Sequence, residues 1–161
     1  MKFIVDSMLG KLSKWLRILG YDTIYDAGMS DEQLFFQAHL ERRVLLTRDN
    51  ELAGRMNPHN RLFIFSEEVR EQVKQVLVTY HLEPGDKIFT RCTLCNSLVE
   101  PIEKELIQGK VPDYIYETID EFVQCKTCHK IYWPGSHLKG VRKILHEIQE
   151  TDSRRDKGGK S

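Results

Sequence analysis

The sequence predicts an α/β fold in which a parallel sheet carries helices on both faces and is followed by a small cysteine-containing module. Short apolar runs alternate with helix-period segments through the first half of the 161-residue chain. This order is typical of parallel strands joined by right-handed helical crossovers. The turn signal at residues 84–86 separates that half from the rest, and all four cysteines lie beyond it.

The expected strands are short and mostly continuous apolar runs, as in strands that are buried on both faces of a sheet. Phe3-Ile4-Val5 is the first, and Val44-Leu45-Leu46-Thr47 is the third. The predicted strands occupy residues 3–5, 22–25, 44–47 and 62–65.

The expected helices carry apolar residues at helical spacing between these strands. The first ends at Gly20, a residue that often terminates helices. Ser30 and Gln33 form a capping-box pattern that opens the second helix, and Ser66 is expected to cap the fourth. The four helices begin near residues 8, 30, 50 and 66.

The composition argues against several classes of protein. The 24 basic and 24 acidic residues give zero net charge, which disfavours a strongly basic nucleic-acid binder. An apolar content of 40% disfavours a disordered chain. No apolar run approaches the ~18 residues of a membrane span, and Asp6 interrupts the apolar start that a signal peptide would need. We therefore expect a cytoplasmic protein that does not enter membranes.

Two Cys-x-x-Cys turns predict a metal site. Cys92 and Cys95 form the first turn, and Cys125 and Cys128 form the second. Four thiolates at such spacing are typical of a zinc ribbon, in which the closed tetrahedral site makes the zinc structural. A disulfide is disfavoured in the cytosol, and a redox pair needs one such motif at the start of a helix.

The separation between the two turns is longer than in an ordinary ribbon, so we expect a hairpin or helix around residues 101–120. Ser136 is expected to cap a last helix. The predicted organisation is an α/β domain at 1–85, a zinc ribbon with a C-terminal helix at 86–150, and a disordered tail at 151–161.

Three aspartates are expected at the carboxyl edge of the sheet, where open α/β sheets bind ligands. Asp6 ends the first strand, Asp49 follows the third, and Asp31 lies in the first turn of the second helix. Converging carboxylates repel one another unless a divalent cation joins them, and Mg²⁺ or Mn²⁺ suits phosphodiester hydrolysis. The structural alternatives are a helix-dipole role for Asp31 and a capping role for Asp49. Asp6 is the hardest to explain structurally.

Four basic residues are candidates for holding phosphates beside such a metal. Lys11, Lys14 and Arg17 recur every three residues on the polar side of the first helix, and Arg48 precedes Asp49. The alternative is a solvated helix face for the lysines. Arg17 is also placed to be half-buried or paired with an acid.

Five segments together resemble the Mut-seven C-terminal RNase domain family. They are residues 6–12, 15–22, 45–49, 91–96 and 125–137, and the resemblance extends from residue 1 to about residue 148. It implies a PIN-like, Rossmannoid nuclease domain fused to a zinc ribbon, with a metal-dependent ribonuclease activity that uses clustered acids. Asp6 then matches the first aspartate of PIN nucleases, Asp49 the aspartate of their Thr-x-Asp signature, and Asp31 the second acid.

The resulting prediction is an endoribonuclease that acts on RNA with Mg²⁺ or Mn²⁺. Its catalytic residues are Asp6, Asp31 and Asp49; its phosphate-binding residues are Lys11, Lys14, Arg17 and Arg48; its zinc ligands are Cys92, Cys95, Cys125 and Cys128. One alternative is a non-catalytic RNA-binding or ribosome- or tRNA-associated module, whose binding would survive chelation of the metal. Another is a phosphohydrolase that acts on DNA or small phosphates, which the 2′-hydroxyl would discriminate.

Overall fold

The computed structural model describes residues 1–135 and 138–147. Contacts within the chain divide it into two units. The first comprises Met1–Val99 and Cys125–Cys128, and the second comprises Glu100–Gln124 and the residues from His129 onward. The domain limits expected at residues 85 and 86 stay a prediction. The expected cap Ser136 and the tail at 151–161 lie outside the described residues.

A four-stranded parallel sheet forms the centre of the first unit, which confirms the predicted α/β fold. The strand order is β2-β1-β3-β4, so β1 and β3 are central. Ile4 in β1 lies opposite Ile24 on one side and Leu45 on the other. The strands are β1 (Lys2–Val5), β2 (Asp22–Ile24), β3 (Val44–Thr47) and β4 (Arg61–Phe63).

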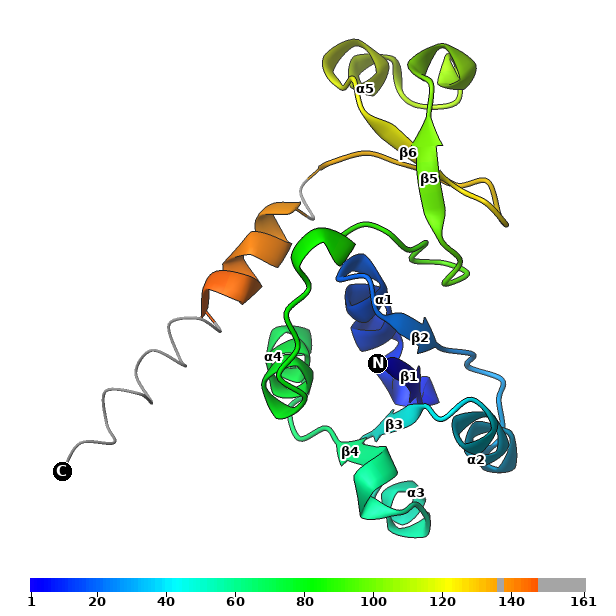
Figure 1. Cartoon of the computed structure of the whole chain (residues 1–161), viewed down its shortest axis with the longest axis vertical. Coiled ribbons are helices and arrows are strands. Elements are labelled where there is room, and N and C mark those ends of the chain that lie inside the picture. Colours follow the sequence, from blue (N-terminus) through cyan, green and yellow to red (C-terminus); the bar gives the residue numbers. More distant parts are fainter. Residues whose placement is uncertain (136–137, 148–161) are drawn as a thin grey trace, which may run out of the picture. The chain divides into compact units, whose positions relative to one another are not determined.

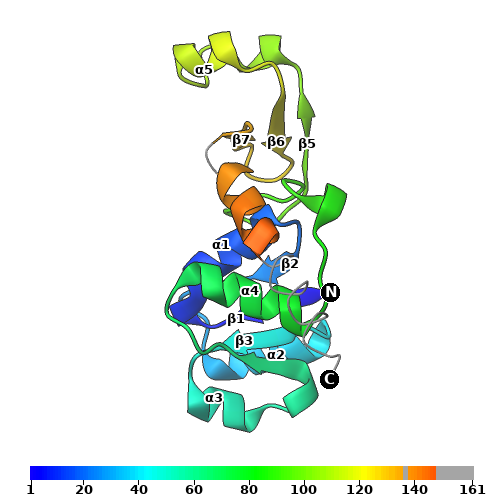
Figure 2. The ribbon, with the colours of Figure 1, turned by 90° about the vertical axis from the view of Figure 1, so that its left-hand side faces the viewer.

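Helices cover both faces of this sheet, as predicted (Figures 1 and 2). Helix α1 contacts α4 on one face, while α2 and α3 pack against β1, β3 and β4 on the other. Short 3-10 turns are present at Ser7–Leu9, Pro58–Asn60 and Gly85–Lys87. The four helices are α1 (Gly10–Ile18), α2 (Asp31–Leu40), α3 (Asn50–Arg55) and α4 (Val69–Thr79).

Side chains that alternate along β1 supply the two layers of the core. Ile4 points to the face where Leu34 and Leu52 of the covering helices pack. Phe3 points to the opposite face and meets the rings of Tyr21 and Tyr80. This alternation is the period-2 geometry of a strand that is buried on both sides.

One helix cap agrees with the sequence prediction and one does not. At α2, the Ser30 Oγ accepts a hydrogen bond from the Gln33 N–H and the Gln33 side chain accepts one from the Ser30 N–H, which confirms the capping box. At α4, the N-cap is Glu68 and not the predicted Ser66. The Ser66 hydroxyl accepts a hydrogen bond from the Glu68 N–H at 3.1 Å, so it shapes the turn that precedes the helix.

The second unit is built on a smaller sheet of order β5-β6-β7. Its strands are β5 (Val99–Ile102), β6 (Phe122–Cys125) and β7 (Ile131–Tyr132), the last two antiparallel. A 3-10 turn at Lys104–Ile107 and helix α5 (Asp113–Thr118) occupy the stretch where a hairpin or helix was expected. Ile107, Val111 and Phe122 form the core, and Trp133 packs against Phe122.

Residues 138–147 are helical, in agreement with the predicted last helix. Across the described ranges, no helix combines the length and the apolar character that crossing a membrane requires.

Candidate functional site

The four cysteines come together within the first unit. Their Sγ atoms all lie within 4.8 Å of one another, with 3.3 Å between Cys95 and Cys125 and 3.5 Å between Cys92 and Cys128. A zinc ion bound tetrahedrally at about 2.3 Å from each sulfur needs sulfurs about 3.8 Å apart. The sulfur cluster therefore fits a metal ion such as zinc, as the paired cysteine turns predicted.

Backbone N–H groups and a shifted thiol pKa suit this cluster to metal binding. Cys95 N–H donates to the Cys92 Sγ at 3.5 Å, and Cys128 N–H donates to the Cys125 Sγ at 3.4 Å. Burial raises the pKa of the Cys95 thiol, but hydrogen bonds, chiefly from Ser97, outweigh that effect and lower the pKa to about 6. At neutral pH Cys95 therefore carries the thiolate, the form of cysteine that binds metal.

Arg17 ties the first cysteine turn to the α/β sheet. It is buried, its Nε donates to the Thr23 carbonyl at 2.9 Å, and its Nη1 donates to the carbonyls of Thr93 and Leu94, each at 2.9 Å. Thr93 and Leu94 are the two residues between Cys92 and Cys95. The placement does not suit the phosphate contact predicted for Arg17, because the guanidinium binds carbonyls of its own chain.

Asn96 makes a second attachment at the edge strand β2. Its backbone has φ 66°, a conformation that Asn tolerates better than most residues, and its Oδ1 accepts a hydrogen bond from the Thr23 N–H at 3.0 Å. Its Nδ2 donates to the Asp22 Oδ1 at 2.8 Å, and Asp22 also pairs with Arg43 at 2.7 Å and Arg91 at 3.8 Å. Burial raises the pKa of Asp22, but the hydrogen bonds from Arg43 and Asn96 and the nearby positive charges lower it overall.

The carboxyl ends of β1 and β3 place Asp6 and Asp49 on either side of Thr47. Asp6 is buried; its Oδ1 accepts from the Met8 N–H at 2.8 Å. Its Oδ2 accepts from the Arg48 N–H at 3.0 Å and from the Thr47 hydroxyl. The Asp49 N–H donates to the same Thr47 Oγ1 at 2.9 Å. The structure therefore joins the two aspartates through one threonine.

Asp49 also caps a helix, as the structural alternative proposed. Its Oδ1 accepts from the N–H groups of Glu51 at 2.7 Å and Leu52 at 3.0 Å, at the start of α3. The side chain is exposed. Among the described residues, its second oxygen, Oδ2, has no hydrogen-bond partner, so capping leaves one carboxylate oxygen available to a ligand.

Asp31 does not join Asp6 and Asp49 in a three-carboxylate group. It is exposed at the start of α2, where Arg55 pairs with it at 3.4 Å and with Glu32 at 3.3 Å. Within residues 1–135 and 138–147, the cysteines are the one group of three or more His, Cys, Asp or Glu side chains close enough to share an ion. Of the three predicted catalytic aspartates, Asp6 and Asp49 are the two that the structure connects, through Thr47.

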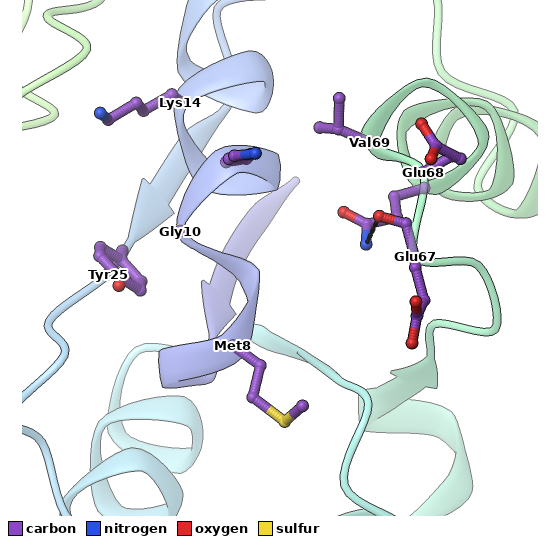
Figure 3. A pocket seen from close by; sticks show the side chains of 9 residues that line it. Met8, Gly10, Lys14, Tyr25, Glu67, Glu68 and Val69 are labelled. Atoms are coloured by element: carbon purple, nitrogen blue, oxygen red, sulfur yellow. Dashed lines mark hydrogen bonds between the residues drawn. The ribbon is translucent and has the colours of Figure 1, made fainter.

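A cavity of about 560 Å³ lies between the start of α1 and the start of α4 (Figure 3). Lys11 and Lys14 line it from α1, Tyr25 lines it from the end of β2, and residues 67–69 and 72 line it from the other side. Both lysines are exposed, and neither has an ion pair within the part of the chain that the structure describes.

Arg48 lies beside this cavity and holds one of its walls in place. Its Nη1 donates to the Ser66 carbonyl at 2.9 Å, and its Nη2 pairs with Glu67 at 3.1 Å. Of the four predicted phosphate-binding residues, the structure thus brings Lys11 and Lys14 to one cavity and places Arg48 at its margin. Arg17 is directed to the cysteine turn.

These features define an α/β protein with a cluster of four cysteines that could hold a metal such as zinc, and with two aspartates at the carboxyl edge of its sheet. A family model described as Mut7-C RNAse domain matches residues 1–145, and the chain belongs to this family. The description points to a ribonuclease-type function and hence to RNA as the substrate. Searches of curated proteins and of solved structures found no match.

Proposed function

We propose that this protein is a metal-dependent endoribonuclease with a PIN-like α/β domain, whose Mg²⁺ or Mn²⁺ ion binds at the carboxyl ends of β1 and β3. The observation that carries the proposal is that Asp6 and Asp49 follow the ends of two neighbouring strands and both contact Thr47, Asp6 through its carboxylate and Asp49 through its backbone N–H. Ligands of open parallel sheets bind at this edge. The family description supplies the reaction class, cleavage of RNA.

The two aspartates have different parts in this proposal. Asp6 accepts three hydrogen bonds, which fix the orientation of its carboxylate and still leave acceptor capacity for a metal. Asp49 contributes the oxygen that its capping role leaves available. A bound Mg²⁺ or Mn²⁺ ion activates water and stabilises charge on the phosphate.

Asp31 is the third carboxylate of the proposed site. Its side chain is about half exposed, and so is that of its partner Arg55. Ion pairs of this kind contribute at most about 1 kcal/mol, so they open readily. Asp31 then joins the site when the pair with Arg55 opens, as a further carboxylate ligand or through a water molecule.

Cleavage of single-stranded and structured RNA with Mg²⁺ or Mn²⁺ tests this function. We expect Asp6→Asn and Asp49→Asn each to lower the cleavage rate about 100-fold or more, because each removes a charged ligand. Asp49→Asn is the gentler change, since Asn is also a good helix cap. Asp86→Asn, at an exposed acid of the 3-10 turn Gly85–Lys87, is the matched control and should cleave at the wild-type rate.

Wild-type cleavage rates in both site variants, with zinc content and circular dichroism unchanged, would contradict the proposal. The competing function is a non-catalytic RNA-binding module, favoured by the structural partners that Asp6, Asp31 and Asp49 each have. It predicts RNA binding without cleavage products, unchanged in Asp6→Asn.

A further inference from the structure

We propose that the cavity between α1 and α4 binds one nucleotide unit of an RNA strand: a phosphate together with its ribose and base. The choice of a nucleotide rests on the proposed function, whereas the shape and charge of the cavity do not. The volume of about 560 Å³ lies within the range of about 300–1,000 Å³ found for small-molecule sites.

The wall formed by α1 suits the phosphate. Lys11 and Lys14 are three residues apart, so they lie on one face of the helix. Both are exposed and line the cavity, and neither has an ion pair within the described ranges. Two ammonium groups without a partner at one cavity wall attract an anion, and lysine is a common phosphate ligand.

The opposite wall suits hydrogen-bond donors. Gln72 is buried and its Nε2 donates to the Ser66 carbonyl at 2.9 Å, so its Oε1 is the acceptor end of the amide. Glu68 has no ion pair among the described residues and adds a carboxylate to the same wall. Ribose hydroxyls and the amino groups of bases are donors that can use both acceptors.

The charge pattern of the two walls favours a ligand with two different ends over simpler ligands. A free phosphate would be attracted by Lys11 and Lys14 but would meet the carboxylate of Glu68 across the cavity. A divalent cation would be attracted by Glu68 and repelled by the lysines. A ligand with an anion at one end and donors at the other satisfies both walls, and a nucleotide has this arrangement.

Apolar and aromatic groups complete the lining. Met8 is 66% exposed, and Figure 3 shows it at the cavity together with Tyr25 and Val69. The Tyr25 hydroxyl donates to the Ser7 carbonyl at 3.2 Å, and its ring packs so closely on Gly10 that a Cβ there would lie 2.8 Å from it. Tyr25 is thus a fixed aromatic surface of the kind on which RNA bases stack.

Hydrogen bonds connect both walls to the proposed catalytic carboxylate. Met8, on one wall, donates its N–H to the Asp6 Oδ1. Arg48 donates its N–H to the Asp6 Oδ2 and pairs through its guanidinium with Glu67 on the other wall. The nucleotide in the cavity is therefore a neighbour of the phosphodiester bond that would be cleaved.

Binding measurements without Mg²⁺ or Mn²⁺, on the zinc-containing full chain, test this site independently of cleavage. The probes are a fluorescent single-stranded RNA oligonucleotide, adenosine 5′-monophosphate and inorganic phosphate. We expect the double variant Lys11→Gln/Lys14→Gln to weaken RNA binding at least about tenfold. The slope of log affinity against log salt concentration should become shallower by about one to two. Lys2→Gln, at an exposed lysine at the start of β1, is the matched control and should bind within about twofold of wild type.

Glu68→Gln tests the donor-binding wall. We expect the variant to bind adenosine 5′-monophosphate several-fold more weakly, while its affinity for inorganic phosphate stays equal or rises. Equal losses for both probes, or no loss for either, would overturn the assignment of this wall. If adenosine 5′-monophosphate displaces the RNA, the cavity binds one nucleotide unit of the strand, as proposed. If the mononucleotide binds but RNA does not displace it, the proposal is overturned.

The two proposals fail in different ways. Lysine-dependent RNA binding by a wild-type protein that cleaves nothing would overturn the proposed function and leave the nucleotide site standing. Metal-dependent cleavage with an unchanged KM and unchanged RNA affinity in the double lysine variant would overturn the nucleotide site alone.

Discussion

Two charged residues with little exposure, Arg17 and Asp22, hold the Cys92–Cys95 turn against the sheet. Arg17 donates to the two carbonyls inside the turn, and Asp22 accepts from Asn96 directly after it. Charges away from water are stabilising only when their hydrogen bonds are satisfied. Both residues meet this condition by joining elements that are about 75 residues apart in the chain.

Asp22 gives the fold a pH dependence whose direction follows from its lowered pKa. Stabilisation by such a carboxylate is fully present above its unfolded-state pKa, near 3.8, and is lost as the pH falls through the lower folded-state value. We expect Asp22→Asn to lower the free energy of unfolding by about 1–2 kcal/mol at pH 7. The difference from wild type should shrink below about pH 4 in urea unfolding with excess zinc.

Asp86→Asn serves as the control, since Asp86 is exposed, and its difference from wild type should stay near zero at every pH. A difference between wild type and Asp22→Asn that stays constant down to pH 3 would contradict the role assigned to the Asp22 carboxylate.

At the scale of elements, α1 connects the cavity to the cysteine turn, because it carries Lys11 near its start, Lys14 in its middle and Arg17 near its end. The helix ends in a Schellman motif: Tyr21 N–H donates to the Leu16 carbonyl and Gly20 N–H to the Arg17 carbonyl, each at 2.9 Å. Gly20 has φ 89°, and a Cβ there would lie 2.1 Å from the Lys87 carbonyl oxygen. The end of α1 therefore requires glycine.

We expect Gly20→Ala to lower the free energy of unfolding by at least about 1–2 kcal/mol, the cost of a left-handed backbone with a side chain, and by more through the contact with Lys87. Gly54→Ala is the matched control, because a Cβ at that position in α3 meets nothing within 4 Å. This change should stabilise the protein by up to about 1 kcal/mol. Urea unfolding of the two variants measures both effects; equal stability of Gly20→Ala and wild type would contradict the first.

At the scale of the whole molecule, the four-cysteine cluster joins two distant segments of the chain. Cys92 and Cys95 lie ahead of residues 96–124, Cys125 and Cys128 follow them, and all four belong to the first unit. Because Arg17 and Asn96 attach the first turn to the sheet, a metal that orders the turn also stabilises the α/β unit. Because the unfolded chain lacks this site, the free energy of metal binding contributes to the free energy of folding.

Removal of zinc should therefore destabilise the α/β unit. At a free zinc concentration about 1,000 times the dissociation constant, the stabilisation is about 4 kcal/mol, and a chelator should abolish it. Thermal unfolding followed by circular dichroism measures this destabilisation. The starting protein should contain one zinc ion per chain. Zn²⁺ should restore the Tm after chelation and Mg²⁺ should not, while an unchanged Tm without zinc would contradict the coupling.

Local patterns determined most of the secondary structure. The apolar runs, the Ser30–Gln33 capping box and Gly20 act through neighbours in the chain, so the sequence contains the whole interaction. The cysteine spacing likewise predicted a four-sulfur site, because two Cys-x-x-Cys turns supply all four ligands. Ser66 was misplaced as a cap by two residues, since its hydroxyl bonds within the preceding turn.

The sequence by itself determined the α/β class, the family and the residues available for chemistry. Only the tertiary structure decided which of those residues meet. It placed Asp6 and Asp49 on either side of Thr47, turned Arg17 toward the cysteine turn and paired Asp31 with Arg55. Strand order and helix packing bring distant residues together, and these depend on burial across the whole chain rather than on any local pattern.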